Sequence, residues 1–211
     1  NITFNGDGYT LSYGTAGNTS TGIDIPGANN SFIHNITVKE GSSTGSSKIG
    51  IRLGRTINTT IANSTIVNNG SASRGISVVT AANGGFIHNV TATKVGSLGV
   101  PFNLGASDNF TYLDNVVNAT AGIATLWNMG SNSTARRNTV FSYGGNAIVF
   151  VLSGNVIEYN NITFISGNGD GISFTGSNDT IVSGNIINVT NGNGIAISAA
   201  LNVNITNNTI S

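Results

Sequence analysis

The strongest constraint on the fold is a short motif, glycine-isoleucine-any-apolar, that returns along the whole chain with conservative replacements. Its copies begin at Gly22, Gly50, Gly75, Gly99, Gly122, Ala147, Gly171 and Gly194, at intervals of 28, 25, 24, 23, 25, 24 and 23 residues. A unit of this length is too short to bury its own apolar side chains, so each copy must pack against its neighbours. The period therefore predicts a solenoid.

The residues between the motifs favour strands and tight bends. Apolar residues alternate with polar ones, 29 glycines accompany many asparagines and threonines, and only 8% of the residues are charged. Since a strand rises about 3.3 Å per residue, one repeat accommodates three short strands separated by bends. We therefore predict an all-β fold, a single-stranded parallel β-helix. Residues 1–211 form one domain in this prediction, with an irregular N-terminal coil at 1–21 and eight repeats at 22–211.

Two columns of asparagine run in step with the motif. The first consists of Asn30, Asn58, Asn83, Asn109, Asn132, Asn155, Asn178 and Asn202, and the second of Asn35, Asn63, Asn89, Asn115, Asn138, Asn161, Asn185 and Asn208. An asparagine amide has an acceptor and two donors, so it can bond the backbone of a bend and the same amide one coil away. The columns predict two asparagine ladders at corners. The phase slips in the later copies, so Asn160 or Asn207 are alternatives for the second column.

The repeat resembles the right-handed parallel β-helix repeat family. This family includes pectate-lyase-like enzymes, the β-helix protein of copper-site maturation in nitrous oxide reductase, and many bacterial and archaeal surface proteins. The resemblance implies right-handed coiling, which the period alone does not specify.

Composition restricts the partners and the location. The formal net charge is zero, which favours neither nucleic acid nor an anionic membrane surface as a partner. No cysteine is present, and the longest apolar run, residues 147–152, is far too short to cross a bilayer. We expect an extracellular protein of the cell surface, in which the sequons at Asn18, Asn69 and Asn118 are candidate N-glycosylation sites.

The largest differences in repeat length collect at one corner, in residues 39–48 and 68–74. Insertions in a solenoid often mark its binding surface. Lys48, Arg52 and Arg74 are expected near these insertions, either as ordinary solvated charges or as a site for an anion or a glycan. Asp24 and Arg52, one coil apart, are expected to form a surface ion pair.

The outward positions of the motif strand hold no carboxylate pair; they are Asp24, Arg52, Ser77, Pro101, Ala124, Val149, Ser173 and Ala196. On this ground the sequence predicts no catalytic residues and a protein that is not an enzyme. His34 and His88 are two coils apart, about 10 Å, which is too far to share a metal ion. We expect no metal and no cofactor.

Two functions follow from these expectations. The first is a structural one, as a building block of a cell-surface filament, sheath or surface layer. In it, uncapped β-helix ends associate head to tail with other copies, or with neighbouring segments of a longer chain. The alternative is a glycan-binding or polysaccharide-active β-helix domain of a larger surface protein.

Overall fold

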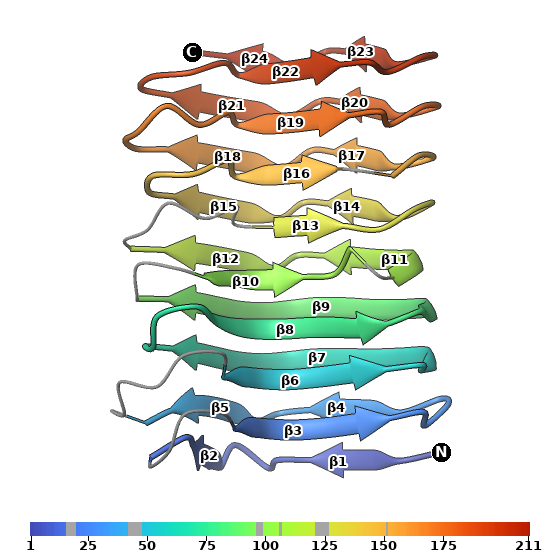
Figure 1. The fold of residues 1–211 in the computed structure, drawn as a ribbon, viewed down its shortest axis with the longest axis vertical. Coiled ribbons are helices and arrows are strands. Elements are labelled where there is room, and N and C mark those ends of the chain that lie inside the picture. The colour runs from blue at the N-terminus through green and yellow to red at the C-terminus, as the bar shows by residue number, and fades with distance from the viewer. Residues whose placement is uncertain (16–19, 42–47, 96–98, 106, 121–126, 151) are drawn as a thin grey trace.

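In the computed structural model, the fold consists of twenty-four strands within the residues that the structure describes. The structure describes residues 1–15, 20–41, 48–95, 99–105, 107–120, 127–150 and 152–211, and no helix occurs among them. The chain winds in coils that stack from the N-terminus at one end to the C-terminus at the other (Figure 1). The fold class predicted from the repeat, an all-β solenoid of parallel strands, is confirmed.

One side of the solenoid is an eight-stranded parallel sheet that contains the repeated motif. Its strands, in spatial order, are β3 (Thr21–Pro26), β6 (Ile49–Gly54), β8 (Ser73–Thr80), β10 (Gly99–Asn103), β13 (Trp127–Met129), β16 (Ile148–Phe150), β19 (Ile172–Thr175) and β22 (Ile195–Ser198). Ile23, Ile51 and Ile76 lie side by side in this register. Ile51 and Ile76 are fully buried, as expected for the inward position of the motif.

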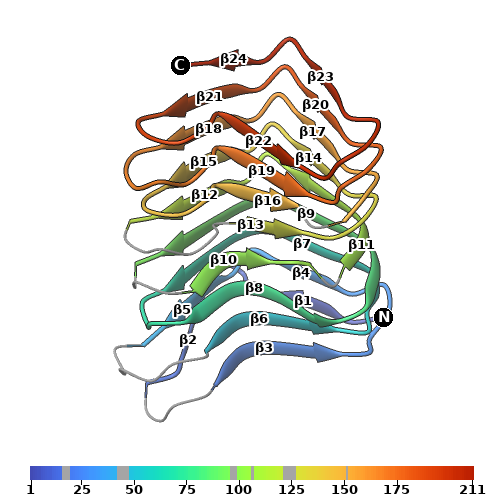
Figure 2. The ribbon, with the colours of Figure 1, turned by 45° about the horizontal axis from the view of Figure 1, so that its top comes forward.

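The other sides belong to a sixteen-stranded sheet with two arms. The first arm contains β1 (Thr3–Asn5), β4 (Phe32–His34), β11 (Ser107–Leu113), β14 (Thr134–Arg136), β17 (Val156–Glu158), β20 (Ile181–Ser183) and β23 (Asn204–Thr206). The second contains β2 (Thr10–Tyr13), β5 (Thr37–Glu40), β12 (Val116–Ala119), β15 (Thr139–Ser142), β18 (Asn161–Phe164), β21 (Ile186–Val189) and β24 (Thr209–Ile210). The long strands β7 (Ile57–Asn68) and β9 (Ala82–Lys94) run through both arms, and Figure 2 shows the bend between the arms in the other coils.

The motif glycine is explained by the close approach of successive coils. A Cβ atom added to Gly22 or Gly50 would lie 2.7 Å from the carbonyl oxygen of the equivalent glycine in the next coil. At Gly50 it would also lie 2.9 Å from Cγ2 of the core residue Ile66. Real Cβ atoms do not approach a backbone oxygen so closely, so the motif needs a residue without a side chain here.

The repeat was aligned wrongly in two copies. Phe102, and not Val100, pairs with Ile76, and Trp127 pairs with Phe102. Both aromatic side chains are fully buried at the inward position, in an edge-to-face contact with ring centroids 5.3 Å apart. Asn103 and Asn128 therefore replace Pro101 and Ala124 in the row that starts at Asp24 and Arg52, whereas residues 122–124 lie outside the described residues.

Candidate functional site

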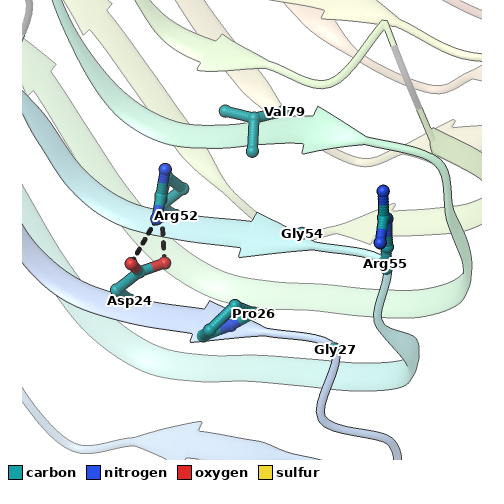
Figure 3. Close-up of a pocket in the computed structure, with 7 residues that line it drawn as sticks. All are labelled: Asp24, Pro26, Gly27, Arg52, Gly54, Arg55 and Val79. Atoms are coloured by element: carbon teal, nitrogen blue, oxygen red, sulfur yellow. Dashed lines mark hydrogen bonds and ion pairs between the residues drawn. The ribbon is translucent and has the colours of Figure 1, made fainter.

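A hollow of about 350 Å³ lies on the eight-stranded sheet over β3, β6 and β8 (Figure 3). It is lined by Asp24, Pro26, Gly27, Arg52, Gly54, Arg55 and Val79. The alternation of the strands explains this lining, because the intervening residues, such as Ile25 and Leu53, point into the core. Gly27 and Gly54 have no side chains, so the surface is depressed at these positions relative to the neighbouring residues.

An ion pair forms one wall of the hollow. The Arg52 Nε donates to the Asp24 Oδ1 at 2.8 Å, and a second guanidinium nitrogen bonds the other carboxylate oxygen. The two residues lie directly beside each other in the β3–β6 register, and both side chains remain more than one third exposed. The predicted surface ion pair is confirmed.

Arg55 supplies the second cation of the hollow. It follows β6 with a left-handed backbone, φ 53°, and its side chain is exposed. Among the described residues, no hydrogen bond or ion pair of its guanidinium is found. Pro26 and Val79 add exposed apolar surface nearby. The hollow thus combines a guanidinium without a protein partner, an ion pair and a small apolar surface.

The predicted group of Lys48, Arg52 and Arg74 does not form one site. Lys48 is completely buried, with its Nζ 3.4 Å from the Glu40 Oε1 and 2.9 Å from the Gly14 carbonyl oxygen that it bonds. Arg74 is exposed and faces Asn103, whose amide oxygen can accept from the Arg74 Nε and a terminal nitrogen at 3.3 Å. Of the three, Arg52 alone lines the hollow. Lys48 was misplaced because it lies at the end of an insertion, where strand alternation gives no orientation.

Residues 42–47 of the first insertion lie outside the described residues, and Lys48 belongs instead to a buried polar cluster that the sequence analysis missed. It consists of Tyr13, Glu40, Lys48, Asn68 and Lys94, each at most 7% exposed. The strand pattern contained a signal for it: Glu40 and Lys94 are two residues after the buried Val38 and Ala92, so alternation alone points them inward.

Five asparagines form a continuous chain of side-chain hydrogen bonds at the corner between the arms. From Asn115 to Asn138, Asn160, Asn185 and Asn208, each Nδ2 donates to the Oδ1 of the next at 2.9 Å. The second-column assignment of Asn161 is wrong, because Asn160 occupies the buried position and Asn161 is exposed.

The N-terminal half of the second column differs. Asn35, Asn63 and Asn89 lie one residue before the inward position, which Ile36, Ser64 and Val90 occupy. These asparagines have left-handed backbones with φ between 46° and 54°, a conformation that asparagine tolerates well. They are exposed, and the Asn89 Nδ2 donates to the Asn63 Oδ1 at 3.3 Å.

The first column forms separate contacts rather than one chain among the described residues. Asn58 donates to Asn30, and Asn109 donates to Asn83. Later members bond other groups: the Asn155 and Asn178 side chains accept from the backbone of Ser133 and Leu201, and Asn202 donates to Asp179. Asn132 has a left-handed backbone with φ 50°.

The remaining candidate residues lie at the surface. His34 and His88 stack on Phe32 and Phe86, with ring centroids 4.2 Å and 4.5 Å apart. Over the described ranges, no three His, Asp or Glu side chains gather in a way that could hold a metal ion. The structure also has no helix, in the part it describes, that is long and apolar enough to span a membrane.

The sequons remain predictions. Asn69 is exposed, and its Nδ2 donates to the backbone oxygen of Glu40 at 3.2 Å. Asn118 is half-buried on β12, and Asn18 lies outside the described residues.

Comparison with solved structures identifies the fold. The T265N mutant of AlgG, a periplasmic alginate epimerase, matches with a TM-score of 0.62 and 11% identity over 88% of this chain and 61% of that chain. AlgG itself matches with a TM-score of 0.50 and 9% identity over 87% of this chain and 61% of that chain. This chain thus spans about three fifths of the length of AlgG. No protein-family model matches the sequence, and a search of the curated proteins finds no match either.

The comparison corrects the prediction that the chain is not an enzyme. AlgG is an epimerase with the same fold, so the absence of a carboxylate pair from one row of residues does not exclude catalysis on such a solenoid. The missing carboxylate pair concerned one sheet face and one type of chemistry, so it left the other faces and other reactions open. The chain has the right-handed parallel β-helix fold.

Proposed function

We propose that this β-helix is an exported domain that binds an acidic polysaccharide in the hollow over β3, β6 and β8. The observation that carries the proposal is the exposed Arg55 guanidinium, which has no protein partner among the described residues and lines the same hollow as the Asp24–Arg52 pair. A guanidinium binds a carboxylate through two parallel hydrogen bonds, and such bonds are stronger than neutral ones. Pro26 and Val79 offer apolar contact to the faces of sugar rings.

Two further features support this ligand class. Three cations of the first coils that are at least partly exposed, Arg52, Arg55 and Arg74, lie on or beside the eight-stranded sheet, which gives an extended anion a line of contacts. AlgG, which has this fold, is an alginate epimerase of the periplasm, and this supports both a polysaccharide ligand and export.

Titration with a soluble polyuronide, followed by calorimetry at low and high salt, tests the proposal. Arg55→Ala should weaken binding about tenfold, as expected for the loss of one charge-assisted pair. Arg136→Ala is the matched control, because it removes the same charge from an exposed position on β14 and should change the affinity less than twofold.

A specific site at the hollow would be refuted if the two variants lost the same affinity for the polyuronide. It would also be refuted if the wild type bound an uncharged polysaccharide as tightly as the polyuronide. The polymer recovered after incubation should also be analysed for its sugar composition. A changed composition that depends on Arg52 and Asp24 would extend the proposal from binding to catalysis.

The exposed apolar residues of the end coils favour a second function, axial stacking of copies in a surface filament. Ile205 and Ile210 are 40% and 52% exposed, whereas Val182 and Ile187, their register partners one coil earlier, are fully buried. Phe4 at the other end is 41% exposed beside the buried Ile33. A second copy stacked head to tail, or a neighbouring segment of a longer chain, would cover these surfaces. Electron microscopy at rising concentration tests this, and rods that stay single at all concentrations would refute it.

A further inference from the structure

A polar column crosses the apolar interior of the first coils. Tyr13 pairs with Glu40, and Asn68 pairs with Lys94, in the parallel register of the second arm. The pairing of Lys39 with Val67 places Glu40 and Asn68 on neighbouring coils as well. Glu40, Asn68 and Lys94 are at most 1% exposed. Burying a charge is unfavourable unless the charge is paired and hydrogen-bonded, so this column is unlike the apolar core around it.

Charges in the cluster do not balance. Lys48 and Lys94 are two buried amines, and Glu40 is the one carboxylate that accompanies them among the described residues of the cluster. The Glu40 Oε2 already accepts from the backbone nitrogens of Asn69 and Gly70, at 2.9 Å and 3.0 Å. Because one carboxylate cannot neutralise two ammonium groups, the cluster favours one lysine in its neutral form.

Lys94 is the lysine that fits this role. Its Nζ donates to the Gly70 carbonyl oxygen, beside the peptide that Glu40 bonds. Burial lowers the pKa of Lys94, and the nearby Glu40 carboxylate offsets this shift in part. A neutral lysine amine is a nucleophile, and it needs an electrophilic carbon held beside it.

Asn68 presents such a carbon on the neighbouring coil. Its Nδ2 donates to the Tyr13 hydroxyl oxygen at 2.8 Å and to the Arg74 carbonyl oxygen at 3.0 Å, which fixes the plane of the amide. Its Oδ1 is buried and has no hydrogen-bond partner among the described residues. The amide is therefore oriented, shielded from water and adjacent in register to the lysine.

We propose that Lys94 and Asn68 join through an intramolecular isopeptide bond. The neutral Lys94 Nζ attacks the Asn68 Cγ and forms a new C–N bond, and the bond from Cγ to Nδ2 breaks. The Glu40 carboxylate accepts the proton that the amine loses and passes it to the departing nitrogen, which leaves as ammonia. The products are one secondary amide and one ammonia, and neither an oxidant nor a reductant is needed.

The reaction has clear physical advantages in this location. It removes one titratable amine from the interior, which leaves Glu40 and Lys48 as a balanced pair. Two groups held side by side in a rigid, dry site react far faster than the same groups in water. The bond also ties β7 to β9, the two longest strands of the fold.

The test begins with the intact mass of the natively purified, then denatured protein. The bond lowers the mass by about 17 Da, that of one ammonia. Trypsin should then fail to cut after Lys94 and should release a branched peptide with two N-termini, Thr56 and Gly75, joined at Asn68 and Lys94. Lys94→Met and Asn68→Ala should both have unreduced masses, whereas Lys39→Met, at an exposed lysine, should keep the loss.

Glu40→Gln separates the proton relay from the two reacting groups. This change keeps the side chain's size and should leave the mass unreduced in protein that still folds. A wild-type mass without the loss overturns the proposal whether or not any variant folds. A mass loss of about 17 Da without a branched peptide, as from succinimide formation at Asn69 and Gly70, overturns the proposal too. A branched peptide joined at Lys48 instead of Lys94 also overturns it.

Discussion

Replacing Asn160 by alanine tests the energetic contribution of the asparagine chain at the corner. The Asn160 Oδ1 accepts from the backbone nitrogen and the Nδ2 of Asn138, both at 2.9 Å. Its Nδ2 donates to the Ala135 carbonyl oxygen at 3.0 Å and to the Asn185 Oδ1 at 2.9 Å. Asn160 is 1% exposed, so water cannot replace these bonds without opening the corner.

The expected magnitude follows from the groups left without partners. Asn160→Ala removes the partners of the Asn138 N–H and the Ala135 C=O, both on the backbone. Each buried polar group left unsatisfied costs about 1–3 kcal/mol, so the free energy of unfolding should fall by about 2–6 kcal/mol. Asn161→Ala, one residue later at an exposed position, should change it by less than about 0.5 kcal/mol.

Urea unfolding followed by circular dichroism measures both variants against the wild type. Equal slopes with a lower midpoint for Asn160→Ala would show a loss of stability in an unchanged fold. If the two variants unfold within about 0.5 kcal/mol of each other, the argument that the chain of amides stabilises the corner is refuted. Asn115→Leu, which removes the first member of the chain and its bond to Asn138, should repeat the large effect.

The other predictions concern the motif glycine and the loss of stability at low pH. Gly50→Ala places a Cβ 2.7 Å from the Gly75 carbonyl oxygen and should destabilise the protein by about 1–3 kcal/mol. The same unfolding assay measures this loss, and unchanged stability would contradict the close approach of the coils. The hydrogen bond from Arg137 holds the pKa of Asp114 below its usual range. Because the folded-state pKa lies below the unfolded one, this stabilisation is present above the unfolded pKa and is lost as the pH falls through the folded pKa. Arg137→Gln should therefore make stability depend less steeply on pH in the acid range. The effect should be small, and smaller still in high salt, because both side chains are exposed. A dependence as steep as in the wild type would contradict the role of the pair.

The architecture could be predicted from the sequence because every coil repeats the same steric requirement. Gly22, Gly50 and Gly75 each lie against the next coil, so their spacing gives the length of one turn directly. The prediction failed where another residue type satisfies the same position, as Phe102 and Trp127 do in place of an isoleucine. A pattern based on one residue type cannot follow such a replacement.

The candidate site was harder to predict, for a different reason. Arg52 and Asp24 are on regular strands, so alternation gave their outward orientation and their pairing correctly. Lys48 comes at the end of an insertion, and its orientation depends on Glu40, which lies on the preceding coil. Arg55 owes its position in the hollow to a left-handed backbone that no pattern in the sequence marks.

The direction of the interstrand hydrogen bonds determines how this protein responds to mechanical load. Each strand pairs with its counterpart in the next coil, so these bonds run along the stack, and the two termini lie at its opposite ends (Figure 1). Tension applied through the termini would break the bonds of one coil before those of the next. Each released coil of about 24 residues adds roughly 80 Å of contour length, so the solenoid would extend under force in steps of one turn.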